Sequence, residues 1–186
     1  MKKTIAILLV LCLCVGLCAC TESTGASERK SSTDQNISDS NGYSSKEEFV
    51  DAYFNMFYVE VVSKKEYKKM FPKQLLEYYG YGEDYITKSY EQYVEAAEKG
   101  INNTKERLGD NYQLSWEIVD VEDSTNYREY TEEERQECLD MFGVEPENYH
   151  MYTLTVSITG TGKNGEFTNP GGMVIARKIA GRWYIY

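Results

Sequence analysis

The stretch SKEEFVDAYFNMFYVEV, residues 45–61, has the pattern of a helix that begins a folded domain. Ser45 followed three positions later by Glu48 is typical of a capping box, in which the serine accepts from the first turn and the glutamate reaches back. Behind this start, apolar residues recur at the spacing of one helical face. That face comprises Val50, Tyr53, Phe54, Phe57, Tyr58 and Val61. The pattern predicts an amphipathic helix whose aromatic side chains belong to a core.

Three further helices are predicted downstream. Ser63 and Glu66 form a second capping-box pattern, and Pro72 suits the first turn of a short helix that Gly80 ends. A long amphipathic helix follows and is closed by Gly109. Its apolar face carries Ile86, Tyr90, Tyr93, Val94, Ala97, Ile101 and Leu108.

After Gly109 the apolar residues alternate as they do in β-strands. The first strand alternates through Trp116 and then shifts phase at Val119, which indicates a β-bulge or a strand buried on both faces. Residues 131–143 interrupt the strands with a short acidic helix, capped by Thr131 and Glu134 and ended by a glycine.

The remaining strands are predicted at residues 149–160, 173–179 and 182–186. Ala180 and Gly181 join the last two as a tight hairpin. The first of the three alternates cleanly, and its inward side chains are His150, Tyr152, Leu154, Val156 and Ile158.

Helices followed by antiparallel strands predict an α+β domain. The N-terminal helices would pack on one face of a curved antiparallel sheet, with the short acidic helix inserted between the first two strands. This order, ending in GRWYI at residues 181–185, resembles the nuclear transport factor 2-like, or cystatin-like cone, fold. More narrowly, residues 46–186 resemble a group of lipoproteins from Gram-positive bacteria through the segment LGDNYQLSWEIVDVED, the acidic helix and the C-terminal motif. That group has no assigned activity.

The N-terminus has the pattern of a secretory signal. Lys2 and Lys3 precede an uncharged run at residues 4–19. This run is shorter than the roughly 20 apolar residues that a membrane-spanning helix needs. The segment Leu17-Cys18-Ala19-Cys20 resembles the lipobox of bacterial lipoproteins. The resemblance implies that residues 1–19 are a signal peptide and that Cys20 becomes the lipidated first residue of the mature chain.

A metal site is the alternative explanation for the crowded cysteines Cys12, Cys14, Cys18 and Cys20. Their spacing and apolar neighbours do not match the C-x-x-C pattern of zinc or haem sites. We therefore expect no metal and no cofactor. After cleavage Cys138 is the one cysteine other than Cys20. Its acidic surroundings predict an inert thiol.

Residues 20–45 contain the lipidated cysteine and a stretch rich in Ser, Thr, Asn, Asp and Gly. Such a composition cannot bury enough apolar surface to fold, so the stretch is predicted to be a disordered tether. A tether of this length reaches roughly 25 to 30 Å. The predicted location is the extracytoplasmic face of the cell membrane, where a diacylglyceryl group on Cys20 anchors the domain at residues 46–186.

The chain carries a formal net charge of −10, and loss of Lys2 and Lys3 takes it to −12. This charge excludes nucleic acid as a partner, since nucleic acid requires clustered basic residues. Anionic headgroups would also repel the domain, so the lipid must provide the anchoring. The expected partner is an envelope protein or a small ligand.

A candidate pocket is predicted at the mouth of the cone. Its residues are Tyr53, Phe57, Trp116, His150, Tyr152 and Trp183. His150 is the single histidine. A lone histidine on a strand is more often a structural hydrogen-bonding group than a base, and the sequence shows no aligned partner for it. We therefore assign no catalytic residue.

A candidate interaction patch is predicted at Tyr78, Tyr79, Tyr81 and Tyr85, around one break between helices. The chain contains 17 tyrosines. Tyrosine combines an apolar ring with a polar tip, which suits it to binding sites. The alternative is that these tyrosines serve as core residues, and only a contiguous exposed patch would indicate binding.

Two functions remain open on the sequence. The first is a non-catalytic module that binds a ligand or an envelope protein. The second is a small-molecule enzyme of the isomerase or dehydratase type that uses His150 with a carboxylate or tyrosine from the helices. A hydrogen-bonded partner of His150 in an open pocket favours the enzyme, and a core filled by aromatic side chains favours the binding module.

Overall fold

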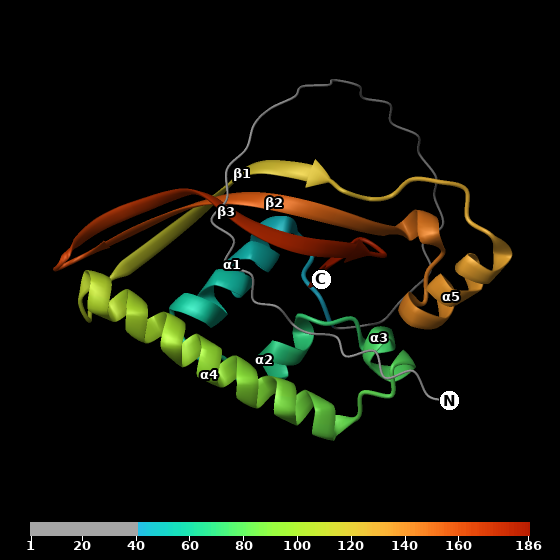
Figure 1. The fold of residues 1–186 in the computed structure, drawn as a ribbon, viewed down its shortest axis with the longest axis horizontal. Coiled ribbons are helices and arrows are strands. Elements are labelled where there is room, and N and C mark those ends of the chain that lie inside the picture. Colours follow the sequence, from blue (N-terminus) through green and yellow to red (C-terminus); the bar gives the residue numbers. More distant parts are fainter. Residues whose placement is uncertain (1–40) are drawn as a thin grey trace, which may run out of the picture. The chain divides into compact units, whose positions relative to one another are not determined.

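The computed structural model describes residues 41–186. It is an α+β domain of helices and an open, four-stranded antiparallel sheet (Figure 1). The helices are α1 (Lys46–Tyr58), α2 (Lys64–Lys69), α3 (Lys73–Tyr78), α4 (Glu83–Leu108), α5 (Glu132–Phe142) and the short 3-10 helix η1 (Pro146–Asn148). The strands are β1 (Gln113–Asp123), β2 (Tyr149–Gly162), β3 (Gly165–Ile179) and β4 (Arg182–Ile185).

The predicted signal peptide at residues 1–19, the cysteines Cys12, Cys14, Cys18 and Cys20, and the tether up to residue 40 lie outside the described residues. Residues 41–45, which the composition placed in the tether, contact the domain. The backbone of Tyr43 pairs with Trp183 of β4 through N–H···O bonds of 3.0 and 2.9 Å, and the N–H of Gly42 donates to the carbonyl of Lys69. The ordered domain therefore begins at least five residues before Lys46.

The sheet follows the chain in the order β1-β2-β3-β4. Ile118 pairs with Val156 and Asp120 with Thr155, so Val119 is the extra residue of a β-bulge, as the phase shift predicts. The predicted hairpin at Ala180 and Gly181 is also confirmed. Both residues have positive φ, 48° and 82°, which matches the twist of a two-residue antiparallel turn.

The helix α1 lies between the sheet and α4 (Figure 1). Phe54 of α1 stacks on Trp116 of β1, with ring centroids 5.5 Å apart, and Phe57 meets Tyr93 of α4 at 5.7 Å. Because α1 is contacted on both sides, its buried surface is wider than one helical stripe. Phe49 and Met56, which the stripe omitted, are fully covered.

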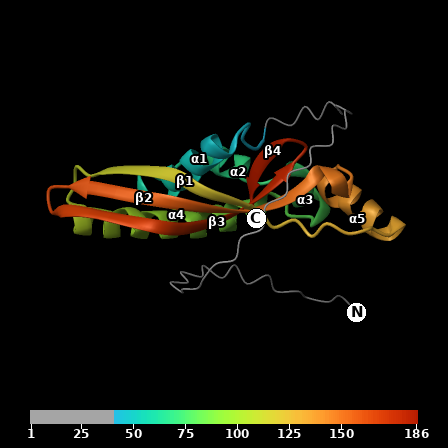
Figure 2. The same cartoon turned by 90° about the horizontal axis from the view of Figure 1, so that it is seen from above.

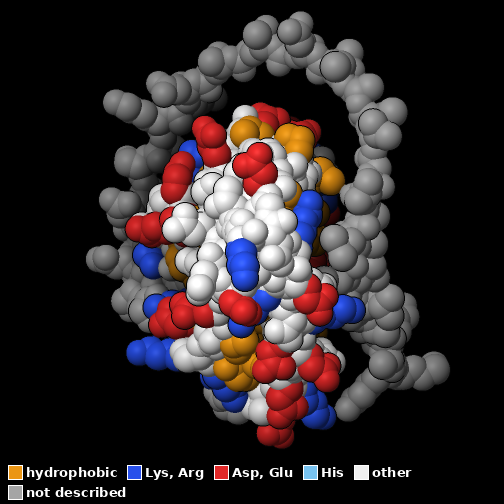
Figure 3. Space-filling model, turned by 90° about the vertical axis from the view of Figure 1, so that its left-hand side faces the viewer, with side chains coloured by type: hydrophobic (Ala, Val, Ile, Leu, Met, Phe, Trp, Pro, Cys, Tyr) orange, Lys and Arg blue, Asp and Glu red, His pale blue; other side chains and the backbone are white. Residues whose placement is uncertain are grey.

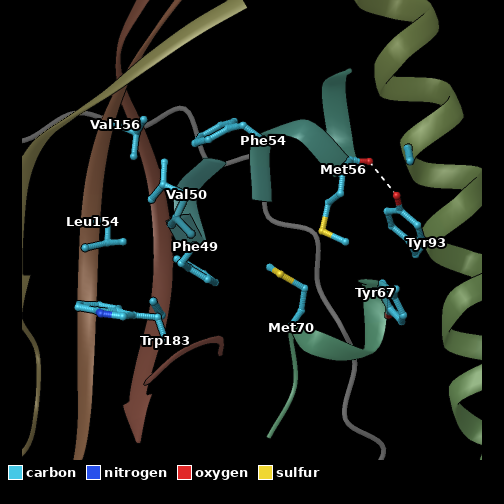
Figure 4. Close-up of a cluster of buried hydrophobic side chains, with 13 residues drawn as sticks. Phe49, Val50, Phe54, Met56, Tyr67, Met70, Tyr93, Leu154, Val156 and Trp183 are labelled. Atoms are coloured by element: carbon cyan, nitrogen blue, oxygen red, sulfur yellow. Dashed lines mark hydrogen bonds between the residues drawn. The ribbon is translucent and has the colours of Figure 1, made fainter. Parts of the chain in front are cut away.

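Figure 4 shows the contacts that α1 makes with the sheet on one side and with α4 on the other. Phe49 and Val50 face Leu154 and Val156 of β2, while the carbonyl of Met56 accepts a 3.0 Å hydrogen bond from the hydroxyl of Tyr93. Val61 was predicted to continue the stripe, but α1 ends at Tyr58 and Val61 is exposed.

The tyrosines on the inner face of α4 are core residues with satisfied hydroxyls. Tyr90 donates to the carbonyl of Val62 at 2.9 Å, and Tyr93 accepts from the N–H of Val62 at 2.9 Å. These bonds satisfy the backbone between α1 and α2 while the rings fill apolar space. For this pair of tyrosines the core explanation holds.

The helix boundaries follow the predicted capping residues with one shift. Thr131 and Glu134 form a complete capping box on α5, and Gly143 ends that helix with φ 69°. On α1 the Ser45 hydroxyl accepts from the N–H of Glu48, but the Glu48 carboxylate accepts from Ser44, one residue earlier than predicted.

The helices α3 and α5 lie together at one end of the domain, beyond the end of α4 that begins at Glu83 (Figures 1 and 2). α5 follows β1 and precedes β2 in the chain. A small second core joins this end to the sheet. It consists of Phe142, Val144, Ile179 and Tyr184, with Leu75, Cys138, Met141 and Tyr149 packed against it.

Candidate functional site

Three of the predicted pocket residues belong to the packed core. The Tyr53 ring lies 5.1 Å from that of Phe57, and Phe57 continues to Tyr93. The indole N–H of Trp116 donates to the Asp51 carboxylate at 2.5 Å. Burial raises the pKa of Tyr53 to about 12, so its hydroxyl stays protonated at neutral pH. These side chains contact one another and form an aromatic core around α1.

The other three predicted pocket residues form a row at the end of the same sheet face. Trp183 is buried, and its ring centroid lies 4.9 Å from that of Tyr152. His150 follows, 6.3 Å from Tyr152. Trp183 of β4 and Tyr152 of β2 are thus continuous with the core around α1, and His150 lies at the outer end of the row.

His150 has a hydrogen-bonding partner that the sequence analysis missed. The hydroxyl of Tyr127 donates to Oδ2 of Asp123 at 2.5 Å and lies 3.3 Å from Nδ1 of His150. With its proton directed at the carboxylate, the phenol oxygen can accept from Nδ1–H of the imidazole. The result is a hydrogen-bonded series of carboxylate, phenol and imidazole groups.

The register of the sheet brings the side chains of Asp123, Tyr127 and His150 together. Asp123 ends β1 opposite Tyr152, and the bulge at Val119 sets that pairing. The Asp123 carboxylate also accepts from the N–H of Thr125 at 2.9 Å, which shapes the loop that carries Tyr127. In the sequence, the only sign of this site is a carboxylate at the end of a strand followed by a tyrosine four residues later. That sign is weak, because it does not show that His150 of the neighbouring strand lies opposite.

The pKa values of this group follow from its contacts. Burial opposes the ionisation of Asp123, but hydrogen bonds from Thr125 and Tyr127 outweigh it and hold the pKa of Asp123 below its ordinary value. The same bond to Asp123 raises the pKa of Tyr127. The Tyr127 side chain is 66% exposed, so water reaches this group freely.

The four tyrosines of the predicted interaction patch are brought together as one row of ring contacts, in which Tyr78 meets Tyr79 edge-to-face and the other two pairs are stacked. We call this row the tyrosine ladder and define it as Tyr78, Tyr79, Tyr81 and Tyr85. Successive ring centroids are 5.2, 5.2 and 3.9 Å apart, and the last pair is nearly parallel at 11°. Gly80, with φ +64°, forms the turn between α3 and Tyr81.

The ladder faces solvent. Tyr78 and Tyr79 are each 43% exposed and Tyr85 is 40% exposed, in contrast to the buried Tyr93 of the same long helix. Partial burial raises the pKa of Tyr79 and of Tyr85, so both remain neutral phenols. A contiguous exposed aromatic row is the observation that distinguishes a binding surface from scattered surface aromatics.

An open hollow of about 540 Å³ adjoins the ladder where α3 packs on α5. We call it the acidic hollow and define it by its lining residues Tyr78, Glu132, Glu133, Gln136, Glu137 and Asp140. Asp140 accepts from the Gln136 amide at 2.8 Å. Glu132, Glu133 and Glu137 make no ion pair with any residue between 41 and 186.

The two arginines nearest in the sequence to the carboxylates of the acidic hollow, Arg128 and Arg135, pair with other carboxylates. Arg135, the basic residue of α5, contacts Glu147 at 2.6 Å and Glu145 at 3.4 Å. Arg128 contacts Glu134 at 2.5 Å. The carboxylates of the hollow therefore face solvent with their charge uncompensated by these arginines.

The opposite end of the domain has a different surface. There, at the tip of the β2–β3 hairpin and the end of α4, hydrophobic side chains appear as separate spots among charges of both signs (Figure 3).

Cys138 on α5 is expected to react slowly. Burial, together with Glu145, Glu147 and Glu137, raises the pKa of its thiol to about 11 from an ordinary 9.0. Because the thiolate is the nucleophile, alkylation of the folded protein by iodoacetamide at pH 8 should be about 100-fold slower than that of the urea-unfolded chain. Mass spectrometry of the peptide that contains Cys138 measures both rates. Equal rates in the two states would contradict the assignment.

The described residues hold no group of three or more His, Cys, Asp or Glu side chains arranged to bind a metal ion. Within the same residues, none of the helices is both long and apolar enough to cross a membrane. The fold and its surfaces thus define an α+β domain with an exposed aromatic row beside an acidic hollow at one end. Comparison with protein families, curated proteins and solved structures finds no match to this chain.

Proposed function

We propose that this chain is a membrane-anchored lipoprotein whose domain binds a partner at the extracytoplasmic face through the tyrosine ladder. The observation that carries the proposal is the continuous row of ring contacts among four partly exposed tyrosines, one pair edge-to-face and two pairs stacked. Such a row is rigid before binding, so little side-chain entropy is lost when a partner covers it. The lipobox-like segment ending at Cys20 supports the anchoring.

The finer fold assignment belongs to the same proposal. Helices packed on one face of a bulged antiparallel sheet are the arrangement expected of a cystatin-like cone. The well-filled space around α1 supports a binding role at the surface over a reaction inside the cone.

Site-specific photo-crosslinking tests the binding role. A benzoylphenylalanine at Tyr79 should give a discrete adduct in intact cells, because the ladder would be covered by its partner. The matched control places the same group at Met173, which is 66% exposed on β3. Adducts of equal yield at both positions, or none at any of the four ladder positions, would refute the proposal.

The hydrogen-bonded chain of Asp123, Tyr127 and His150 supports a second candidate, an isomerase- or dehydratase-type enzyme. In that case His150 would accept a proton from a small substrate while Asp123 and Tyr127 hold the imidazolium. Since the protein has a single histidine, its NMR signal reports directly on this site. Perturbation of the signal by cyclic ketones, lost in the Tyr127→Phe variant, would favour the enzyme.

A further inference from the structure

We propose that the tyrosine ladder and the acidic hollow together bind an extended, arginine-containing segment of a partner protein. This inference rests on the proposed binding function and specifies the chemistry of the partner. The ladder supplies the apolar contact area, and the hollow beside it determines the charge of the side chains that fit.

Charge complementarity selects a cationic occupant. The carboxylates of Glu132, Glu133 and Glu137 make no ion pair within residues 41–186, and Arg128 and Arg135 pair with other acids. Arg177 is partly buried over the Phe142 ring. A second copy of the proposed mature chain would itself carry a formal net charge of −12, the full-chain value of −10 less Lys2 and Lys3, so self-association at this acidic surface is disfavoured.

The aromatic wall favours arginine over lysine. Tyr78 belongs to both the ladder and the acidic hollow, so one cationic group can contact a ring and a carboxylate together. A guanidinium is planar, stacks on tyrosine and binds a carboxylate through two hydrogen bonds. An ammonium group makes the charge contact but lacks the planar stacking surface.

The spacing of the acidic side chains favours an extended segment. Glu133 and Glu137 lie four residues apart on one face of α5, as do Gln136 and Asp140 at its mid-point and end. Four residues of α-helix rise about 6 Å. Alternate side chains of an extended chain lie about 6.6 Å apart on one face. Two arginines separated by one residue therefore match two successive carboxylates.

Fluorescence anisotropy with synthetic peptides and the purified full-length chain in non-ionic detergent tests this inference. A labelled peptide with the Arg-Ser-Arg pattern should bind at least about tenfold more tightly than its Lys-Ser-Lys and Glu-Ser-Glu counterparts. Binding should weaken as salt rises from 50 to 300 mM, since exposed charges are screened. Equal binding of the three peptides, or full competition by spermidine, would overturn the inference.

Paired variants locate the site. Glu133→Gln with Glu137→Gln, and separately Tyr78→Leu, should each weaken binding of the Arg-Ser-Arg peptide about tenfold. The control is Glu95→Gln with Glu98→Gln, which removes the same charge from the exposed face of α4 and should leave affinity unchanged. Equal loss in the control would show non-specific attraction and overturn the inference.

The two proposals fail in different ways. Crosslinking at Tyr79 can be repeated in the Glu133→Gln and Glu137→Gln double variant. If it persists there, the ladder binds a partner that does not need the acidic hollow. The inference of an arginine-containing segment is then refuted, while the proposed binding function stands. If crosslinking at the ladder is absent from wild-type cells, the binding function falls, whatever the peptides do.

Discussion

Replacement of Phe49 by alanine is expected to lower the free energy of unfolding by about 3–5 kcal/mol, as for other buried Phe-to-Ala substitutions. The Phe49 side chain has no exposed surface and faces Leu154 and Val156 from the middle layer of the domain. The lost contacts and the cavity would not relax easily, because α1 is held between the sheet and α4.

Urea unfolding followed by circular dichroism measures this change. Phe49→Leu should cost less, because a leucine fills part of the volume. Tyr78→Ala serves as the surface control and should change stability by less than about 1 kcal/mol, since its ring is 43% exposed. A loss below about 1 kcal/mol for Phe49→Ala would contradict the position of Phe49 in the core.

Replacement of Cys20 by alanine is expected to abolish fatty-acid labelling and move the protein from the membrane to the soluble fraction. Two acyl chains, at about 0.8 kcal/mol per buried CH₂, hold a protein durably at a bilayer. The acidic domain supplies no electrostatic attraction to replace them, because its net charge is strongly negative.

Metabolic labelling with palmitate and fractionation of cells measure the two effects. Cys18→Ala is the matched control, because the lipobox pattern tolerates a small residue at that position and lipidation should persist. Labelling that survived in the Cys20→Ala protein would refute the anchoring proposal. Both positions lie outside the described residues, so this experiment tests the sequence pattern itself.

Much of the local structure could be predicted because it depends on neighbours in the chain. The cap at Thr131 and the end of α5 at Gly143 follow from side-chain and backbone preferences within one helical turn. The bulge at Val119 and the turn at Ala180 and Gly181 follow from alternation and from permitted φ values.

The candidate sites were predictable only in part. The crowding of Tyr78, Tyr79, Tyr81 and Tyr85 is visible in the sequence, but their stacking and exposure depend on the turn at Gly80. The partner of His150 was missed, because Tyr127 lies 23 residues away and reaches it only through the pairing of β1 with β2.

The sequence by itself determined the order of the main elements, the caps and glycines that end several helices, and the single aromatic stripe that begins the domain at α1. It did not determine every end, because β3 begins at Gly165 and not at the predicted residue 173. The tertiary structure decided that α1 is buried on two sides, which places Phe49 and Met56 in the core. It also decided that α3 packs on α5, which sets the ladder beside uncompensated carboxylates. The physical reason is the separation along the sequence of the residues that interact. Helix caps, turns and alternation are set by neighbours within a few residues, whereas burial and charge pairing depend on segments that only folding brings together.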